Sequence, residues 1–242
     1  MRIAMCRPWP ANDGIGYVRR ADDVAPAKGG RMERLLLAGS TGLVGQAALA
    51  LALADGRVGT VIAPTRRALP PHPKLLNPVV DFERLDPDAD HWRADAMICA
   101  LGTTLREAGS RAAFRRVDFD YPLALARLLH RHGAQTLAVT SAAGARPDSR
   151  IFYSRTKGEL EQALAACGFA SLTFVRPALL GGDRARRRAG EHLALRVLTA
   201  LDPMVPARYR VVPATAVAAT LLEAVHAATP GVRIIESEAI RR

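Results

Sequence analysis

With 242 residues, of which 49% are hydrophobic, the chain is long enough for one well-buried domain and hardly for two, and its longest apolar stretches, such as 47–54, are far too short to span a membrane. The net charge of +11 raises the question of a nucleic-acid partner, but nearly all of the positive charge comes from arginines scattered among Asp and Glu, so we expect neither nucleic acid nor a membrane as a partner. The three cysteines, Cys6, Cys99 and Cys167, share no metal-like spacing, which excludes a zinc site and a disulfide framework and predicts a cytoplasmic protein without a metal.

Residues 1–32 show no sustained periodicity and contain several prolines and glycines. We therefore expect a disordered tail or a start codon assigned too early, with the folded unit beginning at residue 33.

From residue 33 to the end at 242, stretches typical of strands and of helices alternate. The predicted strands are 34–38, Val58–Ala63, Val79–Val80, Ala96–Ala100, Thr136–Ser141, Ser171–Arg176 and Val232–Ile235. The predicted helices are Gln46–Ala54, Arg111–Arg131, Ser154–Cys167, His192–Leu201 and Ala214–Ala228. Such alternation predicts a Rossmann-type α/β fold, a doubly wound parallel sheet with helices on both faces. Within this single domain we assign 178–230 to a small C-terminal substrate cap.

The first strand is followed by a glycine-rich turn and then by a helix. A pyrophosphate can approach the N-terminus of a helix only where side chains do not block the backbone, so this layout is typical of a dinucleotide site, although glycines also mark ordinary turns. The residues that we predict to hold the cofactor here are Gly39, Ser40, Thr41, Gly42, Leu43, Val44 and Gly45.

Arg66 and Arg67 follow the second predicted strand, at the place where NAD-binding proteins of this fold carry an acid that holds the ribose 2′-hydroxyl. Two guanidinium groups instead suit a 2′-phosphate, so we expect NADP(H) to be preferred, with NAD(H) possible. The alternative is that both arginines belong to a solvated turn.

Tyr153 and Lys157 lie four residues apart at the start of a predicted helix and therefore share one face. A tyrosine acts as a base near neutrality only if its pKa falls from about 10 to about 7, and a nearby cation favours that change. Ser141, or Thr140 beside it, lies at the end of a strand and would hydrogen-bond the substrate oxygen. We predict Tyr153, Lys157 and Ser141 as the catalytic set, while a chance pair on an exposed helix is the alternative.

These residues resemble the short-chain dehydrogenase/reductase superfamily, in its atypical, epimerase-like branch with the Tat-interacting-protein-like oxidoreductases. The resemblance implies that Leu101 and Gly102 line the cofactor, that Tyr153 is the acid/base and that Lys157 holds the nicotinamide ribose. The motifs that carry it are 39–45, Arg66-Arg67, 101–104, 117–120, 140–144, 153–159 and Arg176-Pro177.

The same resemblance adds Leu180 and Arg188 as positions close to the cofactor. Two residues depart from the superfamily pattern: Asp118 stands where many members keep an Asn that supports a proton relay, and Ala216 stands where extended members often carry an Asp. An ionised Asp cannot donate a hydrogen bond. Efficient catalysis is therefore less firmly predicted than cofactor binding.

The function that we favour from the sequence is an NADP(H)-dependent oxidoreductase acting on a small carbonyl or alcohol, as a monomer or homodimer. One alternative is an NADP(H)-binding sensor with little catalysis. Another is an enzyme similar to sugar-nucleotide epimerases, for which the 178–230 segment is small.

Overall fold

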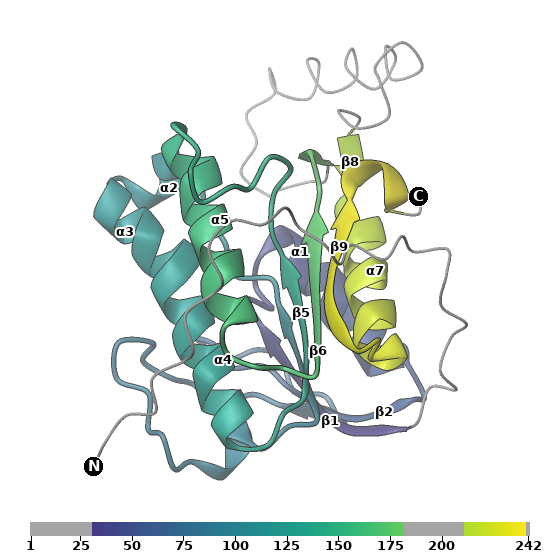
Figure 1. Ribbon diagram of the computed structural model, residues 1–242. Helices are drawn as coiled ribbons and strands as arrows, with labels where there is room; N and C mark the ends of the chain where they lie inside the picture. Colours follow the sequence, from purple (N-terminus) through teal and green to yellow (C-terminus); the bar gives the residue numbers. More distant parts are fainter. Residues whose placement is uncertain (1–30, 182–210, 241–242) are drawn as a thin grey trace, which may run out of the picture.

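The computed structural model describes residues 31–181 and 211–240. In this part of the chain, parallel strands form a seven-stranded sheet in the order β3-β2-β1-β4-β5-β6-β9 (Figure 1). The strands are β1 (Met32–Ala38), β2 (Val58–Ile62), β3 (Leu75–Leu76), β4 (Ala96–Cys99), β5 (Thr136–Thr140), β6 (Ser171–Arg176) and β9 (Gly231–Glu236). This is the Rossmann-type α/β fold that the alternation of elements predicts.

Helices cover both faces of the sheet (Figure 1). They are α1 (Leu43–Ala54), α2 (Leu105–Ala108), α3 (Arg111–Arg115), the π-helical turn η3 (Arg116–Asp120), α4 (Tyr121–Arg131), α5 (Phe152–Ala165) and α7 (Ala214–Ala227). Side chains of β1 alternate between the faces: Leu35 and Leu37 pack with α1 and α7, whereas Leu36 packs with α4 and α5. A sheet buried on both faces explains why strands such as β1 and β4 carry apolar residues at successive positions.

The order of the strands places a topological switch beside β1. The chain proceeds from β1 to β2 and β3 on one side and then crosses to β4 on the other. Because the strands are parallel, the segments that follow β1, β2, β4 and β5 meet at one edge of the sheet, which is where ligands bind in such folds. Apart from Leu180, the predicted site residues in the described part of the chain lie at the ends of these strands, in the segments that follow them, or on α5.

Two predicted elements differ in detail. The third strand is Leu75–Leu76, and Val79 makes only an isolated bridge to Thr65, because Pro78 lacks the N–H that a continued ladder needs. The predicted helix 111–131 is interrupted by the π-helical turn η3, which changes the direction of the side chains in the middle of the segment.

The predicted cap requires a correction, because its α7 portion belongs to the core. Val217 and Leu221 are fully buried, and α7 packs on α1 and on the sheet. At the edge opposite the ligand edge, His226 Nε2 lies 3.0 Å from Asp55 Oδ2, and the Arg57 guanidinium pairs with Asp55 and with Glu223.

The remainder of the predicted cap includes a small parallel sheet of β7 (Leu179–Gly181) and β8 (Val211–Pro213). Residues 182–210, with the predicted helix His192–Leu201, lie outside the described residues, as does the predicted tail up to residue 30. Within the described ranges, the helices are too short or too polar to cross a bilayer.

Candidate active site

The turn between β1 and α1 brings three backbone segments into close contact. Gly39 has a φ of 85°, and a Cβ atom on it would lie 2.6 Å from the carbonyl carbon of Ala100, which follows β4. A Cβ atom on Gly45 would overlap the carbonyl oxygen of Gly39. Gly42 caps α1 and donates its N–H to the Gly39 carbonyl at 3.0 Å. The turn therefore needs glycine both for a left-handed backbone and for close approach.

The N-terminus of α1 lacks the partners that usually satisfy it. No side chain caps it, and its first turn contains no acidic residue. Ser40 is buried beside it, and its Oγ has no hydrogen-bond partner among the described residues. A free helix N-terminus with an unpaired buried hydroxyl fits a phosphate group. Leu43 and Val44 pack into the core, so they would offer a ligand only their backbone N–H groups, whereas Thr41 is exposed.

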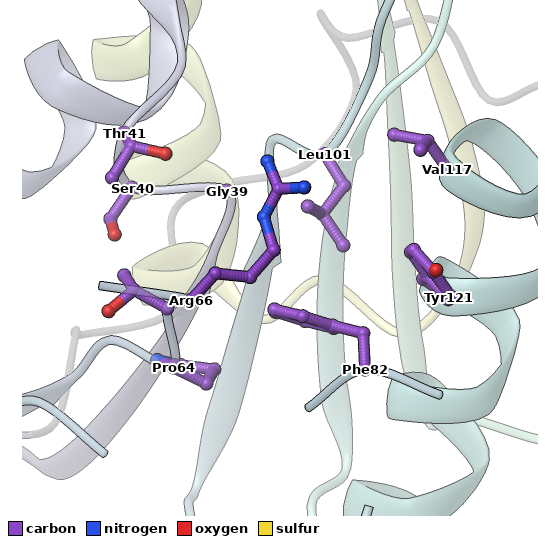
Figure 2. A pocket seen from close by; sticks show the side chains of 10 residues that line it. Gly39, Ser40, Thr41, Pro64, Arg66, Phe82, Leu101, Val117 and Tyr121 are labelled. Atoms are coloured by element: carbon purple, nitrogen blue, oxygen red, sulfur yellow. The ribbon is translucent and has the colours of Figure 1, made fainter. Parts of the chain in front are cut away.

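A hollow of about 90 Å³ opens beside this turn (Figure 2). Arg66 reaches from the end of β2 across the hollow, toward the space between Gly39 and Leu101. Within residues 31–181 and 211–240, its guanidinium makes no hydrogen bond or ion pair. Arg67 does not line the hollow, and its carbonyl accepts a hydrogen bond from Thr65 Oγ1 at 2.7 Å. The structure thus separates the two arginines that the sequence presents together. The hollow is lined by Gly39, Ser40, Thr41, Pro64, Thr65, Arg66, Phe82, Leu101, Val117 and Tyr121.

Two aromatic residues that we did not predict form part of the wall of the hollow. The rings of Phe82 and Tyr121 are 5.5 Å apart at 36°. Tyr121 donates its hydroxyl to Glu83 at 2.5 Å, and burial together with this hydrogen bond raises the pKa of Tyr121, so the phenol stays protonated. Flat apolar surfaces of this kind suit a planar ring. The sequence offers one indication of this wall, because the aromatic residue Phe82 follows the third strand at the ligand edge.

Lys157 and Asp118 form an ion pair beneath the segment that follows β4. Lys157 Nζ lies 2.7 Å from Asp118 Oδ1, and only 4% and 1% of the two side chains are exposed. The other carboxylate oxygen, Oδ2, accepts the N–H of Thr103 at 2.8 Å. A Cβ atom on Gly102 would lie 3.4 Å from Asp118 Oδ1 and 3.7 Å from Lys157 Nζ. The residue that we noted as a departure from the Asn pattern is therefore the counter-ion of the predicted catalytic lysine.

Electrostatics at this pair favour a charged lysine. Burial by itself lowers the pKa of Lys157, but the carboxylate of Asp118 and, to a smaller extent, Tyr153 outweigh burial, and the net shift of the Lys157 pKa is upward. Tyr153 lies one turn before Lys157 on α5 and packs against Phe114, with ring centroids 5.6 Å apart. The structure thus keeps the predicted tyrosine and lysine on one helix face.

Ser141 belongs to a second buried network. Its Oγ donates to Glu161 Oε1 at 2.5 Å, and Glu161 pairs with Arg176, which in turn binds Glu236 of β9 at 2.9 Å. The hydroxyl is therefore already engaged, which conflicts with the role on a substrate oxygen that we predicted for Ser141. Thr140 Oγ1 is buried without a partner among the described residues.

The sequence analysis named three further positions, Leu180, Arg188 and Ala216. Leu180 belongs to β7, pairs with Val212 and packs against the α1 and α7 core. Arg188 lies outside the described residues. Ala216 is a core residue of α7. In the described part of the chain, no three His, Cys, Asp or Glu side chains gather as metal ligands would.

No family profile matches the chain. Protein HTATIP2 from Rattus norvegicus is 36% identical over 163 residues, which cover 67% of this chain and 67% of that protein. The chain belongs to this family of atypical short-chain dehydrogenase/reductases. Protein fmp52, mitochondrial, from Emericella nidulans is 30% identical over 176 residues, covering 67% of this chain and 73% of that protein. Because the fungal relatives are named as mitochondrial, the cytoplasmic location stays a prediction.

Solved structures share the fold at low sequence identity. MoeE5 in complex with UDP-glucose and NAD has a TM-score of 0.63 and 16% identity, with 83% of this chain and 74% of that chain covered. The Bordetella bronchiseptica enzyme WbmH in complex with NAD+ has a TM-score of 0.62 and 15% identity, with 85% and 76% covered. At such identities the likeness establishes the fold alone.

Replacing Gly45 by Ala tests the close approach at the turn. Helix propensity favours Ala in α1 by about 1 kcal/mol, but overlap with the Gly39 carbonyl should reverse this and lower the free energy of unfolding by about 1–3 kcal/mol. Urea denaturation measures the change. Gly56→Ala is the control, because a Cβ atom there meets no atom within 4 Å. Equal stability of the two variants would contradict the proposed crowding.

The variant Ser141→Ala tests the engagement of the serine hydroxyl. Loss of a hydrogen bond to the buried Glu161 should lower the free energy of unfolding by about 1–3 kcal/mol, also measured by urea denaturation. Thr140→Val, which removes an unpaired hydroxyl at nearly constant shape, should leave stability nearly unchanged. If Thr140→Val proves the more damaging change, the assignment of partners is wrong.

Proposed function

We propose that this protein is an NADP(H)-dependent oxidoreductase that transfers a hydride to or from a small carbonyl or alcohol substrate. One observation carries the proposal: two features lie together at one edge of the sheet. The first is the uncapped N-terminus of α1 beside the buried Ser40 hydroxyl, which has no partner among the described residues. The second is helix α5, which bears Tyr153 and Lys157. Family membership and the NAD named in the complexes of MoeE5 and WbmH support a dinucleotide as the ligand.

The residues of the hollow suit the parts of such a cofactor. Backbone N–H groups of the turn from Gly39 to Gly45 would hold the pyrophosphate, and Arg66 would pair with a 2′-phosphate. Phe82 and Tyr121 offer apolar surface for a base, while Leu101 and Gly102 would line the path toward Lys157. We also propose Arg67, Leu180 and Arg188 as contacts of the cofactor. When bound, the nicotinamide ring supplies or accepts the hydride.

The chemistry of the chain itself rests on Tyr153. In reduction its Oη would give a proton to the substrate oxygen, and in oxidation the phenolate would take that proton back. The ammonium group of Lys157, one turn along α5, favours the negative charge on that oxygen. Of the two residues that we named as hydrogen-bond donors to substrate, Ser141 and Thr140, we favour Thr140, because its hydroxyl has no partner among the described residues.

A protein that binds NADP(H) and catalyses little is the second candidate. Two observations favour it: the Ser141 hydroxyl is donated to Glu161, and the charge of Lys157 is offset by Asp118. We do not extend the UDP-glucose of MoeE5 to this chain, because α7 belongs to the core and leaves less of 178–230 for a cap.

The preference for NADPH over NADH should depend mainly on Arg66 and much less on Arg67. We expect NADPH to bind roughly ten to a hundred times more tightly than NADH, since a bidentate contact with phosphate is worth about 1.5–3 kcal/mol. Arg66→Ala should remove this preference, whereas Arg67→Ala, the neighbouring control that does not line the hollow, should retain most of it. Isothermal titration calorimetry measures the NADPH and NADH affinities of the parent protein and of both variants. Equal affinity of the parent protein for NADPH and NADH would refute the preference.

Tyr153→Phe separates the two candidate functions. The ring that packs on Phe114 remains, so NADPH affinity and the melting temperature should be nearly unchanged. Turnover should fall about a hundredfold or more, as expected for loss of a positioned acid or base. NADPH absorbance over a broad panel of carbonyl substrates is the measurement. Parent protein that binds NADPH without turnover on any of them supports the sensor, and a fully active Tyr153→Phe variant excludes the proposed mechanism.

A further inference from the structure

The least expected feature of the ligand edge is a carboxylate in contact with the lysine of the proposed site. Asp118 and Lys157 come from separate elements, η3 and α5, and both are buried. Oδ1 of Asp118 lies 2.7 Å from Lys157 Nζ in the ion pair, and Oδ2 accepts the N–H of Thr103 at 2.8 Å. Asp118 thus connects the lysine to the backbone of the loop 101–104.

The π-helical turn is what brings Asp118 to this position. Its five residues, Arg116–Asp120, include two acids, yet only Asp118 is buried while Asp120 is exposed. An ordinary α-helical turn would direct the side chains after the insertion differently, and π turns are frequent at functional sites. The turn therefore selects one of two nearby carboxylates for the interior.

A lysine that is 4% exposed needs a counter-charge to remain protonated. The titratable groups that face Lys157 are Asp118 from η3, Cys99 from β4 and Tyr153 from its own helix. Burial raises the pKa of the Cys99 thiol to about 11, so this group is neutral near pH 7. Asp118 is therefore the group that offsets the lysine charge.

We propose that Asp118 is a positioning residue, whose buried carboxylate keeps Lys157 charged and fixes it to the loop 101–104, so that dinucleotide affinity stays constant from neutral to alkaline pH. The cofactor part of this inference rests on the proposed function, while the charge state of Lys157 does not. Asp118 acts through Lys157 and the loop, and takes no proton from substrate.

The signs of the pH effects follow from the two states of the lysine. In the parent protein the pKa of Lys157 lies above its unfolded value near 10.4, so the stability from this group is fully present below that pH and is lost as the pH rises through the folded pKa. In Asp118→Asn the buried ammonium has no counter-ion, and its pKa falls below the unfolded value. Stability of this variant should therefore rise with pH toward 10.

The first test follows thermal unfolding without cofactor between pH 7 and 10. Asp118→Asn is compared with Asp120→Asn, the exposed acid of the same turn. Asp118→Asn should melt several degrees lower at pH 7, and this difference should shrink as the pH approaches 10. If Asp118→Asn is unfolded at pH 7, it should fold at pH 10. A difference that is constant with pH, or that grows, overturns the proposal.

The second test measures NADPH affinity by calorimetry over the same range. Affinity of the parent and of Asp120→Asn should be constant within about threefold, whereas Asp118→Asn should lose at least tenfold between pH 7 and 9.5 as Lys157 loses its charge. Parallel pH profiles of Asp118→Asn and Asp120→Asn would refute the role of Asp118. A parent protein that binds no dinucleotide would instead refute the proposed function, and the unfolding test would still decide the charge state of Lys157.

Discussion

Backbone crowding at the turn between β1 and α1 determines how the ligand edge is built. Gly39 lies against the backbone that follows β4, and Gly45 lies against Gly39 itself, so any side chain at these positions would push α1 away from the sheet. With α1 held there, its free N–H groups face the switch point between β1 and β4. Arg66 approaches from β2 on one side and Leu101 from β4 on the other. The site is thus a consequence of how closely three segments pack.

Two buried ion pairs fix helix α5 to this edge. The helix supplies the cation of one pair and the anion of the other. Lys157 and Glu161 lie four residues apart on the helix, and each pairs with another element, Lys157 with Asp118 and Glu161 with Arg176 of β6. Desolvation makes such pairs poor sources of net stability, but their geometry is demanding. The two ion pairs hold α5 in one orientation, and this fixes the position of Tyr153, which lies in the first turn of the helix. The same contacts engage groups that would otherwise be free for catalysis, which is why a cofactor-binding sensor remains a competing function.

Patterns local in the sequence predicted most of the fold. Leucine runs such as Leu35–Leu37 identified buried strands, and the glycines between β1 and α1 identified the turn. Contacts between residues far apart in the sequence could not be predicted in the same way. The partner of Ser141 is Glu161 on the next helix, and Tyr121 of α4 packs against Phe82 in the segment between β3 and β4. The hydrophobic pattern of 111–131 also suits an uninterrupted helix, because a π turn is set by tertiary packing and by burial of Asp118.

The assignment of α7 to a cap failed for a related reason. Its alanine-rich sequence gives little indication of which face is buried, and its partner α1 is also composed mainly of Ala and Leu. Small side chains let two helices approach closely, and this packing is evident only when both are placed. Core membership of such a helix depends on its partner more than on its own pattern.

The packing of α1 on α7 also has a consequence for the way the chain folds. The contact between Asp55 and His226 joins residues 171 positions apart, so a large loop must close before α1 is covered. During synthesis α1 emerges early, and the part of its apolar surface that packs on α7 has no partner until the distant α7 leaves the ribosome. In that interval the chain is most open to association with other chains through α1, and chaperones that bind apolar helices would act there.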